Sequence, residues 1–157
     1  MASVSISSIL VPVDFSDASR AALEYALFLR ERFDAAIEVV HAWESPIYAG
    51  AEGIIARDDD GERRTLADIV QRHARMELEV FLRDDVAAHP RLRAHLVEGH
   101  AHAAVLRIAK DHHHDLIVLG THGRHGVARL FLGSVAERVV REASCPVITV
   151  HASGAPK

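Results

Sequence analysis

The strongest constraint on the fold is a continuous apolar segment within residues 115–120, DLIVLG. Such a segment is typical of a strand buried on both faces, as in a parallel sheet covered by helices. Apolar patterns predict further strands at residues 6–13, 36–42, 92–99 and 146–150. Helical periodicity lies between or beside them, at residues 18–33, 62–88, 100–114 and 134–142. This alternation predicts a single-domain α/β fold: an open five-stranded parallel sheet, strand order 3-2-1-4-5, with helices on both faces.

The chain of 157 residues has the length of one domain. We expect ordered structure over residues 5–151 and a long mobile loop at 45–61, where prolines, glycines and successive aspartates interrupt any period. Ser16 or Asp17 is expected to cap the first helix, because short polar side chains accept hydrogen bonds from its first N–H groups. In the helix at 62–88, the spacing predicts one apolar face made of Leu66, Ile69, Val70, His73, Met76 and Val80.

Composition argues against several classes of protein. The net charge is −4 with histidine counted as neutral, so a nucleic-acid binder with a basic face is not expected. The apolar segments are far shorter than a membrane span, and the N-terminus lacks the basic region of a signal peptide, so we expect no membrane association and a cytoplasmic location. Cys145 is the only cysteine, which excludes an intrachain disulfide and a cysteine-based zinc site.

Twelve histidines are unusual for this length, and several lie close together in the sequence. These are His100, His102, His112, His113, His114, His122 and His125. One interpretation is a set of solvated surface side chains, and the run at 112–114 fits a solvated helix end. The other is a metal-binding or pH-sensing site, because imidazole is a common metal ligand and titrates near neutral pH.

Three polar segments are expected at the carboxyl ends of strands, where open parallel sheets bind ligands and the strand order reverses. Asp14 follows the first strand, His41 and Ala42 end the second, and the segment 120–134 follows the fourth. In the order 3-2-1-4-5 the first and fourth strands are neighbours. Asp14 and the segment 120–134 are therefore expected to face each other across one crevice.

The segment 120–134, GTHGRHGVARLFLGS, fits neither familiar phosphate-binding fingerprint. A P-loop requires a second glycine where this chain has His125, followed by Lys-Ser or Lys-Thr, and a dinucleotide fingerprint would follow the first strand. What remains is G-x-x-G, nine residues, and then Gly133-Ser134. Glycines at 120 and 123 are expected to take positive φ and let the backbone approach a ligand. The helix N-terminus at Gly133-Ser134 favours an anion, with Ser134 adding a hydroxyl or capping its own helix.

These residues resemble the universal stress protein family, in its ATP-binding form, along nearly the whole chain. ILVPVDFSDAS resembles the family's first strand and aspartate, and VVHAWE resembles its second strand. The C-terminal stretch DLIVLGTHGRHGVARLFLGSVAERVVREASCPVITV resembles the family signature, and its glycines have the spacing of the family's ATP motif. The resemblance implies a Rossmann-like fold related to adenine nucleotide alpha hydrolases.

The same resemblance implies a site for ATP together with Mg²⁺ or Mn²⁺. Around the phosphates it would place Gly123, Arg124, Gly133, Ser134 and Val135. Along the sugar and base it would place Gly120, Thr121 and His122. At the nucleoside end it would place Pro12, Val13 and Asp14, and against adenine the backbone of Ala42.

Family resemblance further implies a homodimer formed by antiparallel pairing of the last strand, residues Val147, Ile148, Thr149 and Val150. An apolar edge strand would otherwise be exposed to aggregation. The function implied is a nucleotide-dependent regulatory module in the stress response, with no catalytic residues assigned. Two alternatives stay open: a weak ATPase or autophosphorylating enzyme using Asp14 and Ser134, and a histidine-based metal-binding protein.

Overall fold

The computed structural model describes residues 5–46, 55–121 and 132–152. Its main sheet has the order β5-β2-β1-β6-β7, and every neighbouring pair is parallel. The strands are β1 (Ser8–Pro12), β2 (Ala36–Trp43), β5 (Arg93–Glu98), β6 (Leu116–Gly120) and β7 (Val147–Val150). Counted among these five strands, the order is 3-2-1-4-5, so the predicted fold class and strand order are confirmed.

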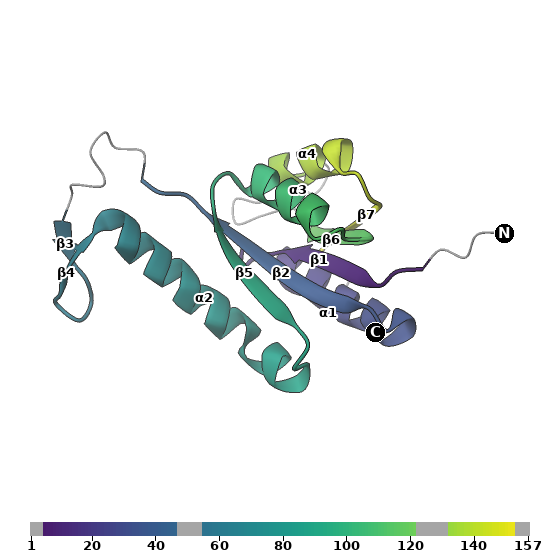
Figure 1. The fold of residues 1–157 in the computed structure, drawn as a ribbon, viewed down its shortest axis with the longest axis horizontal. Helices are drawn as coiled ribbons and strands as arrows, with labels where there is room; N and C mark the ends of the chain where they lie inside the picture. Colours follow the sequence, from purple (N-terminus) through teal and green to yellow (C-terminus); the bar gives the residue numbers. More distant parts are fainter. Residues whose placement is uncertain (1–4, 47–54, 122–131, 153–157) are drawn as a thin grey trace.

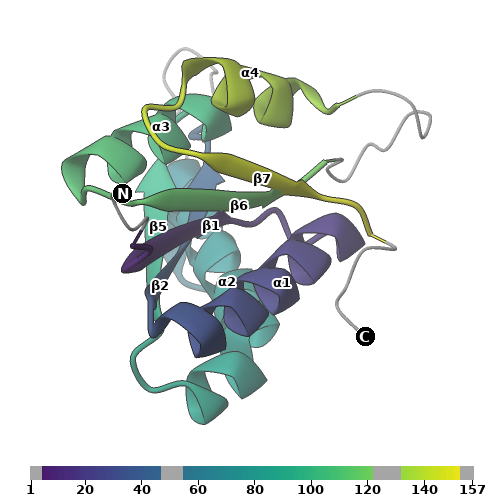
Figure 2. The same ribbon diagram turned by 90° about the vertical axis from the view of Figure 1, so that its right-hand side faces the viewer.

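Helices cover both faces of this sheet (Figures 1 and 2). One face packs against α1 (Asp17–Phe33) and α2 (Leu66–Ala88), and the other against α3 (Ala101–Asp111) and α4 (Ser134–Glu142). Strand alternation divides the core, because Ile9 and Val11 pack toward α1 and α2 while Leu10 packs toward α3 and α4. None of the helices in the described ranges has the length and apolar content needed to cross a membrane.

Local hydrogen bonds explain where the helices begin. Ser16 caps α1, as one of the two predicted residues, by accepting a hydrogen bond from the Ser19 N–H. Thr65 caps α2 in a reciprocal arrangement with Asp68, whose carboxylate accepts from the Thr65 backbone. The helix therefore starts at Leu66 and not at residue 62 as the periodicity predicted.

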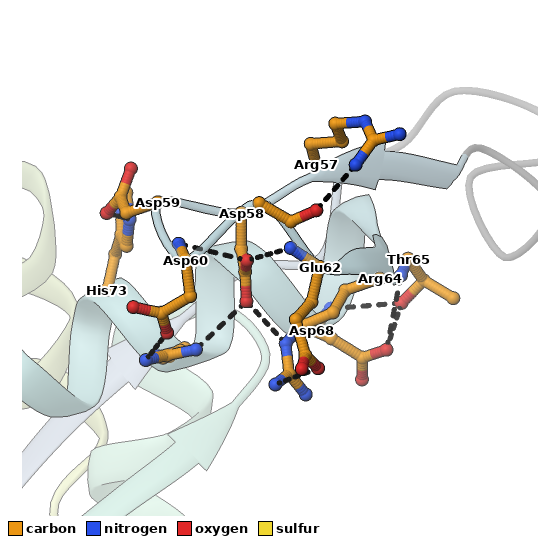
Figure 3. Close-up of polar contacts among 11 residues, drawn as sticks. Arg57, Asp58, Asp59, Asp60, Glu62, Arg64, Thr65, Asp68 and His73 are labelled. Atoms are coloured by element: carbon orange, nitrogen blue, oxygen red, sulfur yellow. Dashed lines mark hydrogen bonds and ion pairs between the residues drawn. The ribbon is translucent and has the colours of Figure 1, made fainter.

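Between β2 and α2, the chain forms an antiparallel hairpin that the sequence analysis assigned in part to a loop. Its strands are β3 (Ile55–Arg57) and β4 (Arg63–Thr65), beside the N-terminal end of α2 (Figure 1). Asp58 holds the turn: one carboxylate oxygen accepts from the Asp60 and Glu62 N–H groups, and the other accepts from Arg64 and Arg72 (Figure 3). Residues 47–54 of the expected loop lie outside the described residues.

The predicted apolar face of α2 is wrong beyond Val70, although Leu66, Ile69 and Val70 are half-buried. Met76 is 50% exposed and Val80 is 62% exposed, while the buried residues are Ala74, Leu78 and Leu82. These three are spaced four residues apart and form a narrow stripe, because α2 packs on one side only against the β2–β5 end of the sheet. The broad apolar pattern in the sequence thus overstated how much of this helix is covered.

Candidate functional site

The carboxyl ends of β1 and β6 lie side by side at the centre of the sheet. Ile9 pairs with Leu116 and Leu10 with Ile117, so both strands run in parallel to the same edge. We call this edge, with the segments that follow the strands there, the carboxyl edge. The connection from β1 leads to α1 on one face, whereas α4, which follows β6, lies on the other. The predicted switch point is therefore present between these two strands.

The segment Pro12–Asp14 continues β1 into this edge. The Val13 N–H donates to the Val40 carbonyl at 2.9 Å. Asp14 is half-buried, and its Oδ1 accepts hydrogen bonds from the Ser16 N–H, the Ser16 hydroxyl and the Ser19 hydroxyl. The carboxylate is thus held over the first turn of α1, where the helix dipole favours a negative charge.

This segment is contacted by His41, which was expected among the polar groups at the strand ends, and by Phe15, which no sequence pattern marked. His41 Nδ1 donates to the Val13 carbonyl at 2.8 Å, which fixes Nδ1 as the protonated nitrogen. Phe15 takes a left-handed conformation with φ of 66°, and its ring centroid lies 4.2 Å from that of His41. A left-handed φ is strained for a bulky residue, and here the Phe15 ring packs against the rings of His41 and Phe81.

Ala42 lies one step beyond the last β1–β2 pair, in which Pro12 is opposite Val40. The Val40 carbonyl faces β1, where it accepts from Val13, and the Trp43 carbonyl faces β5, where it accepts from Gly99. Backbone groups alternate between the two sides of a strand, so the Ala42 N–H and carbonyl turn toward the β1 side. There they border the space next to the Pro12–Asp14 segment.

Gly120 is required by packing and not by its φ, which lies outside the left-handed region, contrary to our expectation. A Cβ at this position would lie 2.7 Å from the backbone carbonyl carbon of Ala18, so α1 fits only against a glycine. Thr121 is buried and joins three elements. Its N–H donates to the Val150 carbonyl, its carbonyl accepts from the Gly133 N–H at 2.7 Å, and its hydroxyl bonds His151.

The Gly133–Thr121 hydrogen bond brings the N-terminus of α4 directly to the end of β6. Gly133 is the N-cap and Ser134 the first helical residue, as predicted for the helix start, but no side chain caps the helix. The first helical hydrogen bond runs from the Glu137 N–H to the Gly133 carbonyl. The N–H groups of Ser134, Val135 and Ala136 therefore have no carbonyl within the helix to donate to.

The remaining predicted site residues, His122, Gly123 and Arg124, lie outside the described residues. The other nine come from β1, β2, β6 and α4 and the segments that follow these strands. Among them, Pro12, Val13, Asp14, Gly120, Thr121, Gly133 and Ser134 lie at the carboxyl edge, and Val135 follows in the first turn of α4. This edge presents helix N–H donors on the β6 side and backbone groups of β2 on the β1 side.

Fold and site together define an open parallel α/β protein with its polar groups gathered at a topological switch point. A family model described as the universal stress protein family matches residues 6–151. The chain therefore belongs to the universal stress protein family.

Known proteins resemble this chain over most of its length. A universal stress protein of Thermus aquaticus is 35% identical to this chain, and the alignment covers 92% of this chain and 98% of the relative. The solved structure of the universal stress protein UspA from Lactobacillus plantarum has a TM-score of 0.78 at 27% identity, covering 94% of this chain and 99% of its own. A family member from Arabidopsis thaliana with AMP bound has a TM-score of 0.61 at 21% identity, covering 92% and 91%.

Proposed function

We propose that this protein binds ATP at the carboxyl edge and acts in the cytoplasm as a nucleotide-dependent regulatory module of the stress response. The observation that carries the proposal is the N-terminus of α4, held against the end of β6 by the Gly133–Thr121 hydrogen bond. Its N–H groups and the positive end of the helix dipole favour phosphate. The AMP-bound relative supports an adenine nucleotide as the ligand.

The β1 side of the edge suits the nucleoside. Ala42 offers one N–H and one carbonyl toward this side, the two groups that recognise the edge of a purine base. Asp14 lies next to it, and a carboxylate held by Ser16 and Ser19 can accept a hydrogen bond from a ribose hydroxyl. Gly123 and Arg124 would complete the contacts with the phosphates.

A divalent ion, Mg²⁺ or Mn²⁺, would accompany the triphosphate. Magnesium keeps several of its waters and needs few protein ligands, so the phosphates themselves would supply most of its coordination. When bound, the ion would neutralise part of the phosphate charge. The residues of the chain would orient the nucleotide and hold its phosphates through backbone N–H groups.

Calorimetric titration of the purified protein with Mg-ATP tests the proposal. The informative variant is Ser134→Asp, because Ser134 is exposed at the first position of α4 and an acidic side chain there suits the helix but repels phosphate. We expect the affinity to fall at least about 30-fold, which corresponds to about 2 kcal/mol.

The matched control is Ala103→Asp, which adds the same charge at an exposed position in the first turn of α3. It should leave the affinity for ATP unchanged. Equal binding by both variants, or no binding by the unmodified protein, would refute the proposal. Following phosphate release in the same samples separates a protein that holds ATP from a weak ATPase.

We also propose that the active form is a homodimer joined through β7. This strand ends the sheet, next to β6 on one side only (Figure 2). The Pro146 carbonyl accepts from Ile117 of β6 and the Val150 carbonyl from Thr121 just after β6, so strand alternation turns the N–H groups of Val147 and Thr149 outward. These outward groups can pair with the same strand of a second copy.

Thr149→Pro removes one outward N–H and leaves the bonds with β6 in place, and proline is tolerated in an edge strand. We expect a monomer by sedimentation velocity, while Thr149→Val should remain a dimer. A dimer that survives the proline substitution would place the interface elsewhere.

A further inference from the structure

A second polar cluster lies on the opposite side of the sheet from the carboxyl edge, toward the amino ends of the strands. It combines Glu38 of β2, His95 of β5, His112 at the C-cap of α3, and His114 just before β6. We call these four residues the histidine–glutamate cluster. Glu38 lies two residues before Val40, and His95 is opposite Val40, so both side chains extend from the face that α3 and α4 cover.

The three imidazole side chains converge on one carboxylate oxygen of Glu38. Oε2 of Glu38 lies 2.8 Å from His95 Nε2, 2.7 Å from His112 Nδ1 and 3.7 Å from His114 Nε2. The ligand atoms of Glu38, His95 and His112 all lie within 4.8 Å of one another. The imidazole rings pack together, with the His112 centroid 5.2 Å from that of His95 and 5.9 Å from that of His114.

His114 is the unusual member. Its side chain has 0% exposure, and neither ring nitrogen makes a hydrogen bond of ordinary geometry among the described residues. Its nearest polar neighbours are the Glu38 carboxylate, 3.7 Å from Nε2, and the Ile108 backbone. A buried polar atom without a partner is costly, and native proteins seldom retain one without a reason. The expectation of a solvated helix end at 112–114 is therefore wrong for His114.

The charges around the cluster suit a cation. The Glu38 carboxylate lies among three imidazole rings, and its negative charge favours a bound cation. The C-terminal end of α3, where His112 lies, also carries the negative end of the helix dipole.

We propose that the histidine–glutamate cluster binds a divalent transition-metal ion, with Zn²⁺ as the preferred one. Imidazole nitrogen and carboxylate oxygen are zinc ligands, and bond lengths of about 2.0–2.1 Å place neighbouring ligand atoms of a tetrahedral site roughly 3.3 Å apart. The three distances to Glu38 Oε2 bracket this value. His95, His112 and Glu38 supply three ligands, and His114 Nε2 supplies the fourth after a small shift.

The proposed metal site is specific to the histidine–glutamate cluster, because the other histidines near it that the structure describes are not arranged to bind a metal ion. It is also separate from the proposed nucleotide site. His113 stands between two members of the cluster but is exposed and belongs to no metal-binding group among the described residues. His100 and His102 lie at the other end of α3, where His100 bonds the exposed Glu44. Imidazole ligands select zinc, copper or nickel over magnesium, so the ion expected with ATP does not compete here.

The test is titration of the metal-free full chain with ZnCl₂ by calorimetry, and with Co²⁺ by visible absorption. We expect one Zn²⁺ per chain with a Kd of about 1 µM or tighter, a rise in Tm, and a cobalt spectrum typical of tetrahedral coordination. Removing a group that only orients a metal ligand typically weakens binding about 10- to 100-fold. His112→Asn and Glu38→Gln remove direct ligands, so each should weaken Zn²⁺ binding by at least about 100-fold.

His113→Asn is the matched control, since asparagine tolerates the left-handed φ of 54° at this position. It should bind Zn²⁺ within about threefold of the unmodified protein. No binding by the unmodified chain, an octahedral cobalt spectrum, or unchanged affinity in Glu38→Gln would each overturn the proposal. The cobalt spectrum requires no variant, so the test holds even if a substitution unfolds the chain.

Discussion

The two edges of the central sheet present opposite chemistry. At the carboxyl edge, α4 begins, and backbone N–H groups and a positive helix end face the space beside β1 and β6. Toward the amino ends, α3 finishes, and a carboxylate and three imidazoles gather beside a negative helix end. One edge therefore favours anions and the other cations.

This difference follows from the architecture. In a parallel sheet every crossover helix begins at the carboxyl edge and ends at the amino edge, so the helix dipoles give the two edges opposite sign. The chain adds side chains that match each sign. The donors at the carboxyl edge are largely backbone groups, such as the N–H groups of the first turn of α4, whereas the histidine–glutamate cluster is built from side chains.

The largest expected effect is that a substitution at either edge weakens the binding of one ligand and leaves the binding of the other unchanged. Glu38→Gln should weaken Zn²⁺ binding at least about 100-fold and leave ATP affinity unchanged. Ser134→Asp should weaken ATP at least about 30-fold and leave Zn²⁺ unchanged. Calorimetry with each ligand on each variant measures all four affinities. If either variant weakens both ligands equally, the two edges form one coupled unit and the comparison fails.

A second prediction tests whether Gly120, at the carboxyl edge, is required for packing against α1. Gly120→Ala places a Cβ 2.7 Å from the Ala18 carbonyl carbon, so the free energy of unfolding should fall by about 1–3 kcal/mol. Urea denaturation measures the change. Ala18→Gly in the same chain should restore only part of the loss, because the close contact is with backbone. Unchanged stability in Gly120→Ala would show that α1 moves aside freely.

The smallest expected effect concerns Asp115, which anchors the start of β1. Its Oδ2 accepts from the Ser7 N–H, the Ser7 hydroxyl and the Ser8 N–H, and these bonds, led by the Ser7 hydroxyl, lower the pKa of Asp115. Asp115→Asn should cost about 1 kcal/mol of stability at neutral pH.

The pH dependence of that difference has a definite sign. A carboxylate whose pKa is lowered on folding stabilises the protein above its ordinary pKa of 3.8, and this contribution is lost as the pH falls through the folded-state value. The stability difference between the Asp115→Asn variant and the unmodified chain should therefore shrink below that pH. A constant difference from neutral to acidic pH would contradict the assignment.

Much of the fold could be predicted from the sequence because local signals agree with the tertiary structure. The buried run at β6 and the helix α4, which spans Ser134–Glu142 as predicted, are clear in periodicity alone. The hairpin was missed because each of its strands has only three residues, too few for a clear alternation, and because Asp58 also bonds Arg72, fourteen residues away. The local bonds from Asp58 to Asp60, Glu62 and Arg64 lie within one short window, but the contact with Arg72 does not.

The two candidate sites differ in how many of their residues could be predicted from the sequence. The carboxyl edge was predicted because its residues follow strands and carry recognisable glycine spacing. The histidine–glutamate cluster was not, because its members come from positions 38, 95, 112 and 114, and only the last two stood in a visible run. The structure splits that run, since His112 and His114 join the cluster and His113 does not.

The central claim is that the carboxyl edge holds an adenine nucleotide, and amide ¹H–¹⁵N NMR spectra of the full chain test it most directly. On addition of Mg-ATP, the account predicts the largest shifts at the backbone N–H groups of Val13, Ala42, Gly133, Ser134 and Val135. The signals of Glu38, His95 and His112 should stay in place until Zn²⁺ is added. Shifts confined to the histidine–glutamate cluster, or none at the N-terminus of α4, would contradict the claim.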